Sequence, residues 1–254
     1  WPISTKKAIS EIEQKINKIA ENCTEKDGSV FLFAVGDGNH SLATAKAVWE
    51  EHKKELIAQG KSKEEIENSP IRYAMVEIVN LYDSGLTFEP IHRVIFNADS
   101  QKLISFLQSN LGGKITKAES WNEVTAKVNG TKNPNTLKKS EGSNFGLCYT
   151  KNGKTEFAIL ETAISELAVA HLQPELDKFA KDNSDSKIEI DYIHGEDELF
   201  SLGKKEGNVA ILLPPITKDS FFATINGRGP LPRKSFSMGE ADEKRFYMEC
   251  RRLF

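Results

Sequence analysis

The residues best suited to chemistry lie in one short turn, Gly36-Asp37-Gly38-Asn39-His40-Ser41, between an apolar run and a helical pattern. The carboxylate of Asp37 could hold Mg²⁺ or act as a base, and His40 could transfer a proton or bind a phosphoryl oxygen. The turn therefore indicates a catalytic centre at Asp37 and His40, with Asp37 as the metal ligand.

The remaining residues of this turn favour the binding of an anion. Gly36 and Gly38 allow a ligand to approach the backbone closely, while Asn39 and Ser41 stand where a helix begins. The first N–H groups of a helix have no intrahelical partner and suit phosphate. The alternative is a helix start without any ligand, because Asp and Asn are common in turns.

A second pair of candidate residues, His92 and Arg93, lies inside the apolar segment 91–94. Successive side chains of a strand point to opposite faces, so both can reach one ligand only if the strand is bulged. Pro90 makes a bulge or an edge position plausible. The alternative is an edge strand with one of the two side chains in solvent.

Two further groups of candidates lie in the last quarter of the chain. His194 follows an apolar strand pattern, but the next helix begins with acidic residues, which need no ligand there. Arg233, Lys234 and Ser235 belong to a proline-containing loop, residues 228–235, that carries three cations. This loop could clamp an anionic ligand or could simply be a solvated basic loop.

The elements that would position the turn at 36–41 can be read from apolar periodicity. Apolar residues at helical spacing predict helices over 5–22 and 41–59, and the run at 30–35 predicts a strand between them. Residues rich in β-branched and aromatic side chains predict strands over 71–81 and 88–96. We expect residues 1–97 to form one α/β lobe that bears the motif.

Residues 98–254 are expected to form a second α/β lobe. A polar loop at 130–144 precedes a hairpin whose turn is Asn152-Gly153, a pair that suits a type I′ turn. Helices and strands then alternate up to residue 224, which suggests a parallel or mixed sheet with crossover helices. The expected fold class is thus α/β (mixed α+β), with mixed sheets and helices in two lobes.

Composition excludes several classes of function. The formal net charge of −3 argues against a general nucleic-acid binder, and no apolar run is long enough to span a membrane. No signal peptide is visible. Cys23, Cys148 and Cys250 are widely spaced and odd in number, which fits incidental thiols in a reducing cytoplasm. A small-molecule or phosphorylated ligand is therefore the expected partner.

Four sequence blocks, taken in order, resemble the uncharacterised family known as domain of unknown function 1015. They correspond to that family's "ADGHHR" block, its "hydrophobic strand, Gly-Leu, then P-T-H-R" block, and its "Y-x-H-G" and "M-P-x-K-S-T" blocks. Here they read Phe33-Ala34-Val35-Gly36-Asp37-Gly38-Asn39-His40-Ser41, Val79-Asn80 through Ile91-His92-Arg93-Val94, Ile190-Asp191-Tyr192-Ile193-His194-Gly195 and Leu231-Pro232-Arg233-Lys234-Ser235. Members of the family usually carry an additional segment ahead of the first helix, so we expect this chain to be a fragment or a short member.

The resemblance implies no assigned activity, but its first block is in turn similar to the nucleotide-binding motif of ParB/sulfiredoxin-like proteins. That group includes small kinases that phosphorylate free serine. The similarity implies a phosphoryl-transfer site that uses a nucleotide and Mg²⁺. Asn39 and Ser41 stand where the family has His and Arg, so a cation and a proton carrier are replaced.

Three hypotheses follow for the function. The leading one is a nucleotide-dependent phosphoryl-transfer enzyme acting on a small molecule, with Asp37 and His40 at the reacting centre. In it, His92, Arg93, His194, Arg233 and Lys234 bind anionic groups of the same ligand. The second is a non-catalytic ligand-binding or regulatory module that uses the same pocket, and the third is a structural or interaction domain.

Overall fold

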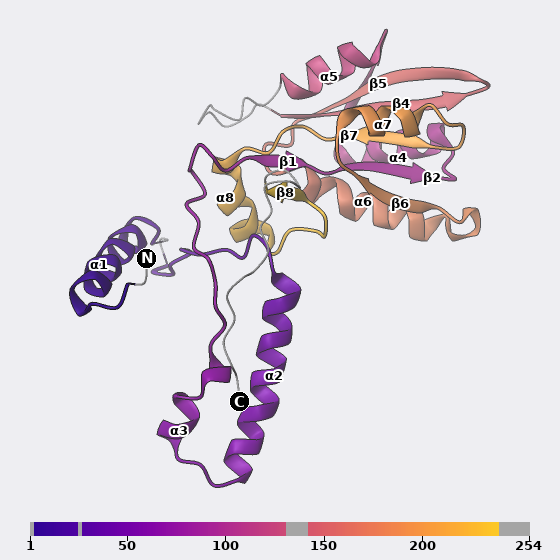
Figure 1. The fold of residues 1–254 in the computed structure, drawn as a ribbon. Coiled ribbons are helices and arrows are strands. Elements are labelled where there is room, and N and C mark those ends of the chain that lie inside the picture. The colour runs from indigo at the N-terminus through magenta and orange to yellow at the C-terminus, as the bar shows by residue number, and fades with distance from the viewer. Residues whose placement is uncertain (1–2, 25–26, 131–141, 239–254) are drawn as a thin grey trace. The chain divides into compact units, whose positions relative to one another are not determined.

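The computed structural model describes residues 3–24, 27–130 and 142–238, and it divides into two compact units. The first contains the described residues up to Asn80, and the second runs from Leu81 to the end of the described chain (Figure 1). Most of the expected polar loop at 130–144, the charged tail after residue 238 and Cys250 lie outside the described residues.

The elements of the first unit, in chain order, are α1 (Lys6–Asn22), α2 (Asn39–Ala58), α3 (Lys63–Glu67) and the 3₁₀ turn η1 (Pro70–Arg72). Those of the second are β1 (Phe88–Pro90), β2 (His92–Phe96), α4 (Ser100–Leu111), β3 (Lys114–Ala118), α5 (Trp121–Asn129), β4 (Ser143–Lys151), β5 (Lys154–Thr162), α6 (Ala168–Asp182), η2 (Ser184–Ser186), β6 (Glu189–Ile193), α7 (Glu196–Gly203), β7 (Val209–Leu212), α8 (Lys218–Arg228) and β8 (Phe236–Met238).

The helices of the first unit follow their sequence signals. Thr5 precedes α1, and its hydroxyl accepts a hydrogen bond from the N–H of Ala8 at 3.3 Å, which caps the helix. α2 begins two residues earlier than expected and ends just before Gly60, which has a φ of +73°. The predictions of the first two helices are thus confirmed to within a few residues.

The prediction of two strands in the first unit, over 30–35 and 71–81, is wrong. In the described chain, residues 31–36 and 73–80 are irregular, and Val30 forms only an isolated bridge with Thr24. A strand exists through its hydrogen-bonded neighbours, and an apolar pattern supplies only one member of such a pair. Many of these apolar side chains are exposed, among them Phe33, Val35, Met75, Val76, Ile78 and Val79.

A six-stranded sheet organises the second unit, with the strand order β3-β5-β4-β7-β2-β6. Every neighbouring pair in it is antiparallel, so the parallel pairing expected for the last third of the chain is wrong. The crossover helices are nevertheless real. α4, α5, α6 and α7 each connect two strands that run in the same direction, and those strands never lie side by side. The mixed α/β class is confirmed.

The hairpin of β4 and β5 forms as predicted. Asn152 and Gly153 have φ values of +52° and +73°, as a type I′ turn requires. α5 packs closely on β4 because Gly146 has no side chain. A Cβ there would lie 2.4 Å from a methyl carbon of Val124.

The strand expected over 88–96 is two strands that belong to different sheets. β1 pairs with β8 in a two-stranded sheet, and Pro90, its last residue, lies at the edge position that proline favours. After Ile91, β2 enters the larger sheet between β7 and β6. The change of sheet places β2 in the interior and β1 beside the C-terminal segment.

One buried cluster of the second unit extends over several strands of this sheet. Val94, Cys148, Ala210 and Leu212 are buried in one cluster, and burial raises the pKa of the Cys148 thiol to about 12. Among the described residues, no helix is long and apolar enough to cross a membrane.

Candidate functional site

The turn at residues 36–41 leads directly into the N-terminus of α2. Gly38 is the N-cap residue, with φ +80° and ψ +16°, a conformation that glycine adopts without strain. As a glycine, Gly38 has no side chain that could accept a capping hydrogen bond at this helix end. The carboxylate Oδ1 of Asp37 accepts a hydrogen bond from the N–H of Gly38 at 2.7 Å, which fixes the acid beside the helix end.

Because α2 begins at Asn39, three of the predicted residues occupy its first turn. The first intrahelical bond is donated by the N–H of Leu42 to the carbonyl of Gly38. The N–H groups of Asn39, His40 and Ser41 therefore point out of the helix end. All three residues are exposed, and a Cβ on Gly38 would meet nothing within 4 Å. The backbone here is open to a ligand.

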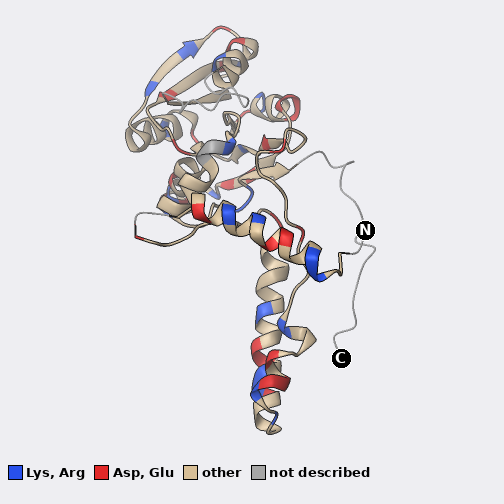
Figure 2. Ribbon diagram, turned by 90° about the vertical axis from the view of Figure 1, so that its left-hand side faces the viewer, with Lys and Arg blue, Asp and Glu red and all other residues tan. Residues whose placement is uncertain are grey.

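The charge distribution along α2 leaves the positive end of the helix dipole uncompensated by its own side chains. The first turn contains no acidic residue, and the charged residues of this 20-residue helix lie toward its C-terminal half (Figure 2). Among the described residues, no group of three or more potential metal ligands is found. Asp37 could hold Mg²⁺ as a single carboxylate ligand beside water and phosphate oxygens.

His92 and Arg93 are both buried, with 4% and 0% of their surfaces exposed. β2 is an inner strand, so the alternative of an edge strand with one solvated side chain is wrong, and no bulge is needed to bury both residues.

The guanidinium of Arg93 is bonded to protein acceptors on several elements. Its Nε donates to Oε1 of Gln173 at 2.7 Å, and its Nη1 donates to the carbonyls of Ile91 and His92. Its Nη2 donates to the carbonyl of Lys234 at 3.0 Å. The guanidinium also lies 4.5 Å from the ring centre of Tyr192. Burial lowers the pKa of Arg93 to about 10, so it remains charged at neutral pH.

The ring of His92 accepts a hydrogen bond at Nδ1 from the N–H of Leu213, at 3.2 Å. Burial, together with the nearby charges of Arg93 and His194, lowers the pKa of His92 to about 4. The imidazole is therefore neutral at pH 7, with its proton on Nε2. This hydrogen bond continues the pairing of β2 with β7, whose backbone register ends at Arg93 and Ile211.

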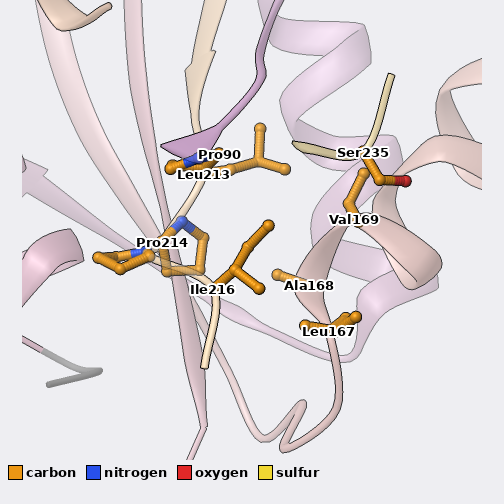
Figure 3. Close-up of a pocket in the computed structure, with 9 residues that line it drawn as sticks. Pro90, Leu167, Ala168, Val169, Leu213, Pro214, Ile216 and Ser235 are labelled. Atoms are coloured by element: carbon orange, nitrogen blue, oxygen red, sulfur yellow. The ribbon is translucent and has the colours of Figure 1, made fainter. Parts of the chain in front are cut away.

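A small pocket, open to solvent, lies at this end of the sheet. We call it the proline pocket, and it is lined by Pro90, Leu167, Ala168, Val169, Leu213, Pro214, Pro215, Ile216 and Ser235 (Figure 3). Leu167 to Val169 form the N-terminus of α6, where the hydroxyl of Thr224 accepts from the N–H of Leu167. The side chains that line it are apolar except for Ser235.

The predicted basic loop shortens to residues 229–235, because Arg228 is the last residue of α8, and it borders this pocket at Ser235. Arg233 and Lys234 are exposed, and Lys234 has a φ of +55°, which is unusual for a residue other than glycine. Ser235 is buried, and its hydroxyl donates to the carbonyl of Pro232 at 2.6 Å. In Figure 3 this hydroxyl is directed away from the pocket residues Pro90 and Pro214, so it does not point into the pocket.

The structure thus brings several predicted residues of the second unit together around the proline pocket: His92, Arg93, Lys234 and Ser235. His194 is exposed just after β6 and is close enough to affect the pKa of His92. Asp37, His40 and the rest of the turn belong to the first unit. A site shared by the two groups stays a prediction.

Some residues of the site carry no signal in the sequence. Gln173, which binds Arg93, lies in the middle of α6 and looks like any polar residue of an amphipathic helix. On the same helix, the Nε2 of His171 lies 2.8 Å from Oε2 of Glu166 and 3.2 Å from Nη1 of Arg228. Such contacts join distant parts of the chain, so sequence spacing cannot reveal them.

Several solved structures are similar to this chain at low identity. One is a conserved hypothetical protein from Pyrococcus furiosus, with 15% identity, 91% of this chain and 84% of that chain covered, and a TM-score of 0.47. Another is a free serine kinase in complex with AMP, with 13% identity, 93% and 81% covered, and a TM-score of 0.45. A mutant of the free serine kinase in complex with ADP gives 14% identity, 91% and 80% covered, and a TM-score of 0.46.

No curated protein matches the chain. The model of one protein family, described as "Protein of unknown function (DUF1015)", matches residues 1–179. Since this match extends over more than half of the 254 residues, the chain belongs to the DUF1015 family.

Proposed function

We propose that this protein is a nucleotide-dependent phosphoryl-transfer enzyme that acts on a small molecule. The observation that carries the proposal is the N-terminus of α2, where an exposed glycine turn presents unpaired N–H groups beside Asp37 and His40. A helix end of this kind binds phosphate through its N–H groups and its dipole. The turn at 36–41 then holds the phosphates of a nucleoside triphosphate.

In this proposal the acceptor of the phosphoryl group is a hydroxyl of the small molecule. Its oxygen forms a new bond to the terminal phosphorus, the bond from that phosphorus to the bridging oxygen breaks, and a nucleoside diphosphate leaves. The hydroxyl proton passes to His40 or to Asp37. Bound Mg²⁺ would neutralise charge on the phosphates, and the carboxylate of Asp37 is the group of the turn that would hold it.

The second unit offers another element suited to anions. Arg233 and Lys234 are exposed on the basic loop, at one side of the proline pocket. Guanidinium and ammonium groups bind phosphate or carboxylate by charge-assisted hydrogen bonds. We propose that this loop binds an anionic group of a ligand in its own unit.

Isothermal titration with ATP and ADP, each with and without Mg²⁺, tests the role of the turn. The sharpest variant is Gly38→Ala, because a side chain at φ +80° is strained and would disturb the helix end. The opposite end of the same helix provides the control, Gly60→Ala. Gly60 has φ +73° and also has nothing within 4 Å of an added Cβ.

We expect Gly38→Ala to weaken nucleotide binding at least tenfold and Gly60→Ala to leave it unchanged. Equal losses in both variants would mean that the effect comes from the stability of α2 rather than from the turn. No heat from any nucleotide with the unmodified protein, at concentrations that detect millimolar binding, would overturn the nucleotide proposal.

The catalytic roles need a separate test. The block around residues 33–46 is similar to a motif of kinases that phosphorylate free serine, so serine is the first acceptor to try. Asp37→Asn should abolish phosphoryl transfer. Asp27→Asn is the matched control, because Asp27 is exposed in the same unit and accepts a hydrogen bond from a backbone N–H, as Asp37 does. Similar rates in both variants would contradict the role of Asp37.

A second candidate function is a non-catalytic ligand-binding or regulatory module. It is favoured by Asn39 and Ser41, which replace the His and Arg of the family block. A nucleotide that binds at the turn, with no transfer to serine or other small hydroxyl compounds, would support this candidate against the enzyme.

A further inference from the structure

The proline pocket is lined by segments from distant parts of the chain, among them Pro90 and the N-terminus of α6. Two further segments, which we call the first and second walls, are 213–216, which follows β7, and the end of the basic loop at Ser235, which precedes β8. Neither wall continues a strand at the point where it borders the pocket, so the sheet ladder does not fix it. Side-chain hydrogen bonds hold the backbone of each wall in place instead.

His92 holds the first wall. The backbone pairing of β2 and β7 ends at Arg93 and Ile211, and beyond it the Nδ1 of His92 accepts the N–H of Leu213 at 3.2 Å. Leu213 is buried and is followed by two prolines, which have no N–H to donate. The His92 bond is thus the last one before the proline segment turns along the pocket.

Arg93 holds the second wall. Its Nη2 donates to the carbonyl of Lys234 at 3.0 Å, while its other nitrogens are bonded to Gln173 and to the carbonyls of Ile91 and His92. Lys234 has a left-handed backbone that a lysine adopts only when its surroundings impose it. A buried, multiply bonded guanidinium is a rigid support for that conformation.

We propose that His92 and Arg93 are a pair of positioning residues that hold the two walls of the proline pocket. Through the second wall, Arg93 sets the direction of Arg233 and Lys234 for a phosphate-bearing ligand. The latter part rests on the proposed function, because it takes the basic loop to bind an anionic group. Neither residue needs to touch the ligand, which accounts for two polar residues in the interior of a sheet.

The role of Arg93 can be tested without any ligand. Arg233 and Lys234 are both sites for trypsin, so limited digestion followed by mass spectrometry reports how firmly the loop is held. Arg93→Met should raise the cleavage rate at these two bonds at least tenfold. Arg93→Lys keeps the charge but lacks the planar fork, so it should not restore protection. Leu199→Ala, in a buried position on α7, is the control for general destabilisation.

The role of His92 is tested by hydrogen exchange at the amide of Leu213, measured by NMR. His92→Leu removes the acceptor and should accelerate this exchange at least tenfold. His92→Gln keeps an acceptor oxygen within reach and should restore much of the protection. If the amide of Leu213 exchanges as slowly in His92→Leu as in the unmodified protein, the role of His92 is overturned. If trypsin cleaves Arg93→Met no faster than the unmodified protein, the role of Arg93 is overturned.

Binding of inorganic pyrophosphate then separates this role from the proposed function. We expect Arg233→Gln, Lys234→Gln and Arg93→Met each to weaken binding, whereas Leu199→Ala should not. If Arg93→Met loosens the loop but pyrophosphate binds as before, the link to the ligand is overturned. If the unmodified protein does not bind pyrophosphate at all, the function proposed for the basic loop fails, while digestion and exchange still decide the positioning role.

Discussion

Two histidine-bearing motifs of this chain are both predicted to bind a ligand, and they differ completely in their surroundings. His40 is exposed in the first turn of α2, beside a glycine with an open backbone, whereas His92 and its neighbour Arg93 are buried in an inner strand. Groups of the first motif are available to a ligand. Groups of the second are bonded to the protein itself. The comparison teaches that residue type suggests chemistry, but burial and hydrogen bonding decide whether it is directed outward or inward.

The largest effect should come from Arg93, the most deeply buried of these groups. Arg93→Met leaves Gln173 and several carbonyls without their donor in a buried site, and we expect about 3 kcal/mol of lost stability. Urea unfolding measures the loss. Arg228→Met is the matched control, since Arg228 forms a partly exposed ion pair with Glu166 and should cost about 1 kcal/mol or less. Similar losses in both variants would break the contrast between buried and exposed groups.

The second effect is the dependence of the free energy of unfolding on pH through His92. The pKa of His92 is lowered from 6.5 to about 4 on folding, so the unfolded state binds a proton at higher pH than the folded state does. The stabilisation is complete above pH 6.5 and is lost as the pH falls toward 4. At 1.36 kcal/mol for each pKa unit, the loss is about 3 kcal/mol.

Carboxylates whose pKa is lowered, such as that of Glu166, also lose stabilisation in acid, so a comparison is needed. Urea unfolding at pH 7 and at pH 4 should show a smaller loss for His92→Gln than for the unmodified protein. The same pH dependence in both would mean that His92 titrates normally and is not held as a neutral acceptor.

Local signals predicted much of the secondary structure. The helices expected over 5–22 and 41–59 and the Asn152-Gly153 turn form to within a few residues of the prediction, because each depends on a few neighbouring residues. The strands expected at 30–35 and 71–81 failed for the opposite reason. A strand needs a partner elsewhere, and the described chain offers these segments none.

The candidate site shows the same division. The position of Asp37 beside the start of α2 followed from the local pattern of glycine and polar residues. The surroundings of Arg93 did not, because its partners Gln173 and Lys234 lie 80 and 141 residues away. The change of sheet after Pro90, which buries β2, likewise depends on pairing with β7 and β6. Such contacts are properties of the fold.

A third and smaller effect is expected at the two glycines that flank α2. A left-handed backbone costs a residue with a side chain about 1–2 kcal/mol, so Gly38→Ala and Gly60→Ala should lower stability by similar amounts. Thermal unfolding followed by circular dichroism measures both. The variants should differ only in nucleotide binding, which is the property assigned to the exposed motif. A much larger loss for Gly38→Ala would indicate that the turn is structural and would weaken the contrast with β2.

The smallest change in stability is expected where the chain departs from the family block. The double variant Asn39→His with Ser41→Arg restores the two family residues in the first turn of α2, which is exposed and can accommodate longer side chains. A cation near a helix N-terminus opposes the dipole and should cost about 0.5 kcal/mol, visible as a small fall in melting temperature. An added charge-assisted hydrogen bond to a phosphate is worth about 1.5–3 kcal/mol, so ATP affinity should rise roughly tenfold or more. Placing the His and the Arg instead at the exposed positions Ala47 and Val48, further along α2, should not raise ATP affinity, since that part of the helix presents no free N–H groups. Equal gains at both places would mean that the ligand responds to net charge, and the exposed turn would then lose its distinction as a phosphate site.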